Sequence, residues 1–145
     1  MNWKHEAIEK LKEYEARVKS VKTIPNEIKR LELDALRIRS ATGDGTPVRG
    51  GGSAREDMLL SNIVHREELE RALEMARMWV ALVDAGLELL APEERLVLER
   101  FYMRPERGNV ERLCQELGLE KTAVYDRRDK ALRHFMLALY GGPET

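Results

Sequence analysis

The amino-acid sequence predicts an all-α protein with an N-terminal helical hairpin, a long coiled-coil-like helix and a C-terminal helix-turn-helix. Apolar residues recur in alternating steps of three and four along most of the chain, as they do on the buried face of a helix. Glycine and proline gather at a few positions that separate these stripes. We therefore expect a helical scaffold at residues 1–90, which is also a possible oligomerisation region, and a helix-turn-helix domain at residues 91–145.

Two helices are expected in the first forty residues. The apolar face of the first helix consists of Ala7, Leu11, Tyr14, Val18 and Val21. Pro25 is expected to end this helix, since proline cannot continue the hydrogen-bond ladder, and to lie in the first turn of the next. The second helix ends near Ser40, and its stripe consists of Ile28, Leu31, Ala35 and Ile38. The two helices together predict a hairpin.

A loop is expected at residues 41–57, where these residues would interrupt a helix: Gly43, Gly45, Pro47, Gly50, Gly51 and Gly52. Asp57 is then placed to cap a long helix. Along that helix a stripe repeats with heptad spacing at Leu69, Leu73, Ala76, Val80, Val83, Leu87 and Leu90. A heptad pattern does not show whether the helix that packs against this stripe belongs to the same chain or to a second copy. A bundle closed within one chain and a dimer through the same face therefore stay equal alternatives.

The last third of the chain predicts three helices with short connections. Pro92 opens the first, and Asn109 is a suitable N-cap for the second. Gly118 ends the second helix, because glycine accepts a left-handed conformation, and the third begins almost at once and ends at Gly141. Two helices joined by a tight glycine turn and supported by another helix form a helix-turn-helix.

Basic residues concentrate in the third of these helices. From Lys121 to Arg133 there are five basic and two acidic residues, a local net charge of +3 in a chain whose formal net charge is −1. An exposed helix of about 10–12 Å diameter fits the major groove, where its side chains reach the base edges. The pattern therefore predicts binding to double-stranded DNA, with Lys and Arg on the phosphates.

Several motifs in the chain resemble known families. Residues 90–98 (LAPEERLVL), 110–119 (VERLCQELGL) and 131–133 (ALR), together with Val124, resemble region 4 of sigma factors over roughly residues 90–137. A second set resembles ArpU-type phage and prophage transcriptional regulators over nearly the whole chain: Trp3-Lys4, 46–53 (TPVRGGGS), Glu56-Asp57, Asn62-Ile63 and 128–135 (RDKALRHF).

The resemblance implies regulation of phage or prophage late genes, with host RNA polymerase as a further partner. By position in the sigma motif, base contacts would fall to Lys121, Thr122, Tyr125 and Asp126, and backbone contacts to Arg112, Arg128, Lys130 and Arg133. One of the positions matching Arg127 and Arg128 is usually apolar in sigma helices, so one arginine must snorkel or the helix must shift. No segment resembles sigma region 2, and a complete sigma factor is not expected.

Other classes of protein are disfavoured by what the sequence lacks. No nucleophile, histidine and acid occur in a recognisable spacing, so we expect no enzyme. The single Cys114 and three scattered histidines offer no metal-ligand spacing, and no cofactor is expected. The first residues lack a signal-peptide pattern and no run of about 18 apolar residues occurs, which indicates a cytoplasmic location without a membrane partner.

Two other functions stay open at this point. A small phage DNA-packaging protein, similar to a terminase small subunit, also joins a helix-turn-helix to oligomerising helices. An adaptor would bind polymerase and never DNA. For the regulator we expect a homodimer, because a single module of this size binds DNA weakly and a second copy raises the effective affinity.

Overall fold

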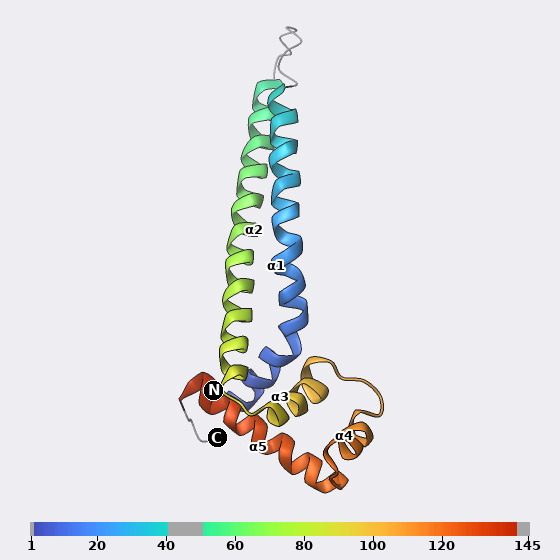
Figure 1. Cartoon of the computed structure of the whole chain (residues 1–145). Coiled ribbons are helices and arrows are strands. Elements are labelled where there is room, and N and C mark those ends of the chain that lie inside the picture. Colours follow the sequence, from blue (N-terminus) through green and yellow to red (C-terminus); the bar gives the residue numbers. More distant parts are fainter. Residues whose placement is uncertain (1, 41–50, 142–145) are drawn as a thin grey trace. The chain divides into compact units, whose positions relative to one another are not determined.

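The computed structural model describes residues 2–40 and 51–141, and its regular elements are all helical (Figure 1). In chain order they are α1 (Trp3–Ser40), α2 (Gly51–Glu88), α3 (Pro92–Leu98), the π-helical segment η2 (Glu99–Met103), α4 (Asn109–Leu117) and α5 (Lys121–Tyr140). Within these described ranges there is no β-strand, so the predicted all-α class is confirmed. No helix in the same ranges is long and apolar enough to cross a membrane.

The predicted break at Pro25 is wrong, because Pro25 lies inside a single α1. The hairpin between residues 3–21 and 25–40 is therefore wrong as well. Proline removes one hydrogen bond of the helix and costs about 3 kcal/mol, but the apolar stripe passes from Val21 to Ile28 without losing its register. Burial of the stripe on both sides of Pro25 favours one continuous helix.

The predicted loop at residues 41–57 is wrong at its C-terminal end. Residues 51–57 belong to α2, so Asp57 lies within that helix and does not cap it. Residues 41–50 lie outside the described part of the chain. The residues after Ser53 include Ala54, Arg55 and Glu56, which have high helix propensity, and the glycines that precede them fall in the first turn of the helix.

The chain divides into two compact units. The first, here called the core unit, comprises Met1–Arg17 and Met78–Thr145, and the second, the two-helix unit, comprises Val18–Arg77. The expected division between residues 90 and 91 does not coincide with these limits. The N-terminal turns of α1 belong with the C-terminal helices because Ala7 and Leu11 are fully buried in the same cluster as Phe135.

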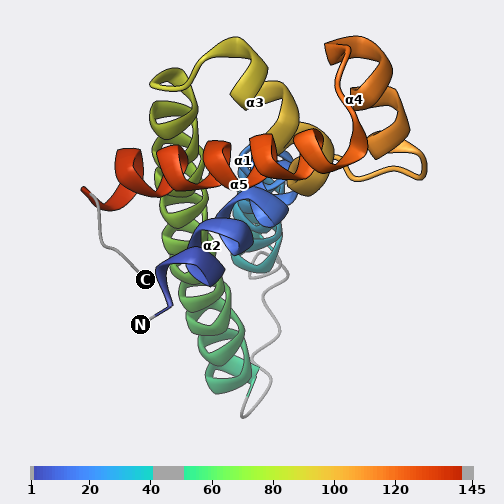
Figure 2. The same ribbon diagram turned by 90° about the horizontal axis from the view of Figure 1, so that it is seen from below.

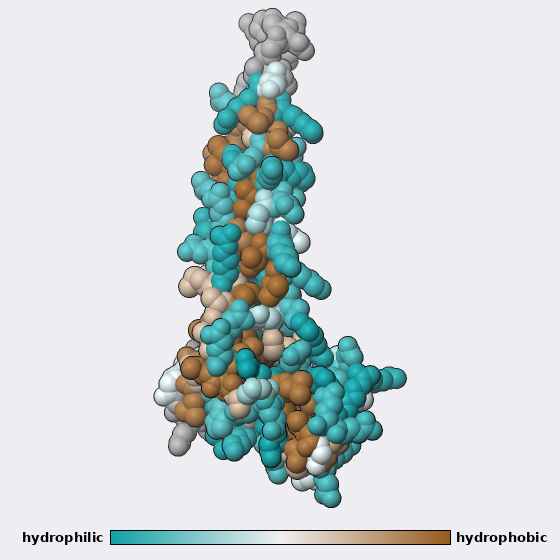
Figure 3. Space-filling view, in the orientation of Figure 1, coloured by the Kyte–Doolittle hydropathy of each residue, from teal (hydrophilic) through white to brown (hydrophobic). Residues whose placement is uncertain are grey.

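In the two-helix unit, α1 and α2 run antiparallel and side by side (Figure 1). Leu31 and Ala35 of α1 and Leu73 and Ala76 of α2 are buried. Apolar side chains follow the line between the helices, with hydrophilic side chains on either side (Figure 3). Nδ2 of the buried Asn62 donates to the backbone oxygen of Leu31 at 2.8 Å, which satisfies a polar group within this seam.

The heptad stripe predicted on α2 faces inward in both units. Leu73, Ala76, Val83 and Leu90 are buried, and the other members of the stripe, Leu69, Val80 and Leu87, are half-buried. Residues of the same chain cover these positions: α1 runs beside α2 in the two-helix unit (Figure 1), and Ala7 and Leu11 of α1 belong to the same buried cluster as Val83 and Leu90 in the core unit. A second copy is not needed to bury this face.

The main cluster of the core unit joins residues from both ends of the chain. Its buried members are Ala7, Leu11, Val83, Leu90, Leu98, Ala131, Leu132, Phe135 and Met136. Gly86 permits the close approach of α5, because a Cβ atom there would lie 2.9 Å from Cε1 of Phe135. Polar contacts also join α1 and α2: the hydroxyl of Tyr14 donates to Asp84 at 2.6 Å, and Trp79 Nε1 donates to the backbone oxygen of Lys10 at 3.2 Å.

A smaller cluster holds α3, α4 and α5 together, and its fully buried members are Val97, Leu113 and Val124, one from each helix. Figure 2 shows α5 running along the core unit, with α4 at its N-terminal end and α3 beside it. The predicted N-cap at Asn109 is wrong, because Gly108 (φ 79°) is the N-cap and Asn109 is the first helical residue. Asn109 Nδ2 instead donates to the backbone oxygen of Arg100 at 2.8 Å, so its amide satisfies a carbonyl of η2.

Candidate nucleic-acid interface

The candidate interface is the N-terminal part of α5, which follows α4 after a tight turn. Gly118 ends α4 in a left-handed conformation (φ 66°), as predicted, and the backbone N–H of Leu119 donates to Cys114 at 3.1 Å. Only Leu119 and Glu120 then precede α5, which begins at Lys121. Val124, in the first turn of α5, is fully buried and anchors this end of the helix on α3 and α4.

The inward and outward faces of α5 are clearly separated. The inward face consists of Val124, Ala131, Leu132, Phe135 and Met136, all buried. Of the predicted site residues on this helix, five are exposed: Lys121, Thr122, Asp126, Lys130 and Arg133. The basic helix is therefore not enclosed by the other helices of the core unit.

Tyr125 and Arg128 lie at the edge of the inward face and are only partly exposed. The ring of Tyr125 is tilted against that of Phe101 of η2, with 5.8 Å between the centroids. The guanidinium of Arg128 lies over both rings, 5.2 Å from the centroid of Phe101 and 5.0 Å from that of Tyr125. Its Nε also donates to Asp129 at 3.0 Å. Arg128 is thus held at the edge of the core, with its guanidinium over two aromatic rings and its charge paired with Asp129.

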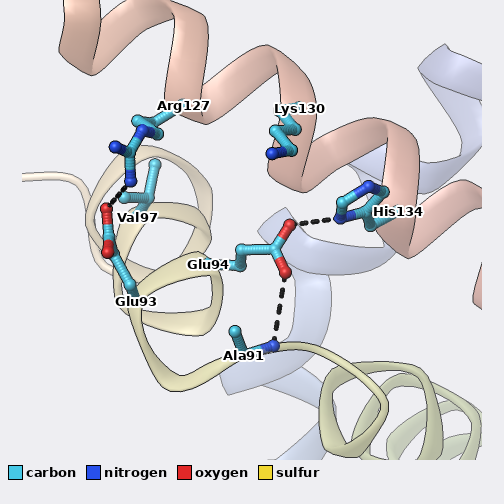
Figure 4. A pocket seen from close by; sticks show the side chains of 7 residues that line it. All are labelled: Ala91, Glu93, Glu94, Val97, Arg127, Lys130 and His134. Carbon is cyan, nitrogen blue, oxygen red and sulfur yellow. Dashed lines mark hydrogen bonds and ion pairs between the residues drawn. The ribbon is translucent and has the colours of Figure 1, made fainter.

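Arg127 and His134 face α3 (Figure 4). Arg127 pairs with Glu93, and Nδ1 of His134 lies against Oε2 of Glu94. The other carboxylate oxygen of Glu94 accepts from the backbone N–H of Ala91 at 3.3 Å, at the start of α3. These surface contacts link the first turn of α3 to the middle of α5, so Arg127 is already paired within the core unit.

A small cavity of about 190 Å³ lies between α3 and α5, and Lys130 lines it between Arg127 and His134 (Figure 4). Unlike its two neighbours, Lys130 forms no ion pair with any residue in the described ranges. Lys121 and Arg133 likewise have no carboxylate partner there. Three of the five basic residues between positions 121 and 133 are therefore available to bind phosphate.

Arg112 comes from a different element than the other predicted residues. It lies in the first half of α4, is exposed, and pairs through Nη1 with Glu106 at 3.1 Å. The ion pair is at the surface, where such pairs contribute about 0–1 kcal/mol, so Arg112 can exchange Glu106 for a phosphate at small cost.

Sequence reasoning missed two features of this region. Nothing in the sequence indicated the role of Phe101, whose ring contacts both the ring of Tyr125 and the guanidinium of Arg128. Nor were the pairs of Glu93 with Arg127 and of Glu94 with His134 predicted. The only available signal was the opposite charge of these residues, which does not specify partners 34 and 40 residues apart.

No protein-family model, no curated protein and no solved structure matches this chain.

Proposed function

We propose that this protein binds double-stranded DNA sequence-specifically through α5 and regulates transcription of phage or prophage genes, acting in the cytoplasm of a bacterial host. α4, the Gly118 turn and α5 then serve as the helix-turn-helix. The observation that carries the proposal is the exposed surface of α5, where Lys121 at its first residue, and Lys130 and Arg133 further along, have no carboxylate partner among the described residues. The role is that of a binding protein and requires no cofactor.

The spacing of these cations suits a duplex groove. Lys121 and Arg133 are twelve positions apart, which corresponds to about 18 Å along a helix that lies in the major groove. Lys130 and Arg133, in the later part of this segment, can then reach phosphates. Lys121, Thr122 and Asp126, nearer the start of α5, face the base edges.

The test of DNA binding is a titration of labelled duplex, followed by fluorescence anisotropy at several salt concentrations. We expect Lys130→Ala to weaken binding to all sequences alike and to lower the slope of log Kd against log salt by about one unit. The matched control is Lys19→Ala, which removes the same charge from an exposed position on α1. Equal affinity and slope for wild type and Lys130→Ala would contradict the assigned face.

The regulatory part of the proposal is tested with RNA polymerase. A gel shift with phage promoter fragments is run beside a polymerase pull-down, both with the full chain. We expect a shift of the promoter fragments and a changed transcript level in a reconstituted reaction. Retention of polymerase without any shift would contradict DNA binding, and a native mass of eight or more chains in a closed ring would contradict the regulator.

A further inference from the structure

Asp126 is an exposed carboxylate on the outward face of α5 that forms no hydrogen bond or ion pair with any described residue. The other acidic residue on this face, Asp129, is different. Its Oδ1 accepts from both Nε and Nη2 of Arg128, each at 3.0 Å, so its charge is compensated within the helix. Asp126 is thus the one uncompensated negative charge among the exposed site residues of α5.

The position of Asp126 places it on the N-terminal side of the cations that would hold the phosphates. It follows Thr122 by one helical turn and precedes Lys130 by another, so the three side chains share one face. Along the helix axis it lies about 6 Å from Lys130 and about 10.5 Å from Arg133. When those two cations reach the phosphates, as the proposed function requires, Asp126 faces the base edges, because the N-terminal part of a recognition helix is the part that contacts bases.

The chemistry of a carboxylate then restricts the base that it can face. An ionised carboxylate only accepts hydrogen bonds. In the major groove guanine presents N7 and O6 and thymine presents O4, all of them acceptors, while adenine places the acceptor N7 beside its amino group. Cytosine presents only a donor, the amino group at N4, and the acceptors of a G·C pair belong to the guanine. We infer that Asp126 determines specificity by accepting a hydrogen bond from the N4 amino group of a cytosine, so the bound site holds a G·C pair there.

The inference is tested with Asp126→Asn, which keeps the shape of the side chain and adds a donor. An amide pairs with N6 and N7 of adenine, so the preferred base at this position should change from cytosine to adenine. The matched control is Asp129→Asn, which makes the same change of charge three residues further on, where the carboxylate is held by Arg128.

Wild type and both variants are used to select duplexes from a random pool, and Kd values are then measured for the selected site and its single-base variants. For wild type we expect one position at which cytosine is favoured about 5- to 150-fold over the other bases. Asp126→Asn should lose that preference and favour adenine, while Asp129→Asn should retain cytosine. Circular dichroism of the variants confirms that the exposed substitutions leave the helices intact.

The outcomes separate this inference from the proposed function on which it rests. If wild type enriches no duplex sequence, both are overturned. If wild type enriches a defined site but Asp126→Asn selects the same bases at every position, Asp126 does not read a cytosine, and DNA binding through α5 still stands. The same conclusion follows if Asp129→Asn changes the base preference as Asp126→Asn does, because the effect is then one of charge alone.

Discussion

Arg128 shows how a single residue departs from a pattern without disturbing the helix. The resemblance to sigma helices implies an apolar residue at one of the two positions that Arg127 and Arg128 occupy, and an arginine there would lose hydration if it pointed into the core. Here its guanidinium lies over Phe101 and Tyr125 and pairs with Asp129. We therefore expect Arg128 to orient Tyr125 at least as much as it contacts phosphate, and its predicted backbone contact stays a prediction.

Tyr14 carries the clearest pH-dependent contribution to stability. Its hydrogen bond to Asp84 and its burial raise the pKa of Tyr14 from 10.0 to about 12. Because the pKa of the Tyr14 hydroxyl is higher in the folded than in the unfolded state, its hydrogen bond stabilises the fold fully below pH 10. This contribution is lost as the pH rises toward 12. We expect Tyr14→Phe to lower the free energy of unfolding by about 1–2 kcal/mol at pH 8, with the difference from wild type narrowing above pH 10. Urea denaturation at a series of pH values measures both.

Tyr140→Phe is the matched control for this prediction. The hydroxyl of Tyr140 is buried and has no hydrogen-bond partner among the described residues, so its removal should leave stability unchanged or raise it slightly. A pH-independent difference between wild type and Tyr14→Phe would mean that the Tyr14–Asp84 hydrogen bond does not contribute in solution.

At the scale of elements, the sequence predicted the C-terminal ends of α4 and α5 better than the continuity of α1 and the start of α2. Gly118 and Gly141 adopt left-handed conformations, a local requirement that glycine meets and that the sequence therefore shows directly. The continuity of α1 and the start of α2 depend instead on burial by residues distant in sequence. Pro25 and Gly51 were taken as breaks because each has a low helix propensity, but propensity alone does not decide when an apolar stripe continues in register.

Pro25→Ala tests this account of α1. Replacement restores a backbone donor and removes the clash with the carbonyl one turn earlier, while alanine gives the unfolded chain slightly more freedom. We expect the free energy of unfolding to rise by about 2 kcal/mol in urea denaturation, with no change in the slope. Asn26→Ala, at the exposed neighbouring position, should change it by less than about 0.7 kcal/mol, since only helix propensity differs. A lower stability of Pro25→Ala would mean that the proline is needed for the local shape of α1.

At the scale of the whole chain, the packing of the N-terminal turns of α1 against α5 could not be predicted from the sequence. The stripe of Ala7 and Leu11 was recognised, but periodicity shows only that a face is buried and does not show that it packs against Leu132 and Phe135 of α5. The predicted boundary at residue 90 therefore assigned these residues to separate domains. The exposed face of α5 was predictable because charged and apolar positions alternate within that helix. The contacts of α5 with Phe101, Glu93 and Glu94 were not predictable, because they join residues that only the folded chain brings together.

The burial of the α2 stripe within one chain leads to a prediction about assembly. If a second copy filled this seam, folding would be coupled to association, and the midpoint of thermal unfolding would rise with protein concentration. Because Leu73, Ala76, Val83 and Leu90 are buried by residues of the same chain, we expect a constant midpoint over an about hundredfold range of concentration. Leu73→Asp should lower the midpoint equally at every concentration, since it places a charge in the seam of the two-helix unit. A midpoint that rises with concentration for wild type, together with a dimer mass in sedimentation that Leu73→Asp converts to a monomer, would show that two chains share this seam. A homodimer whose midpoint stays constant would instead have to form through another surface.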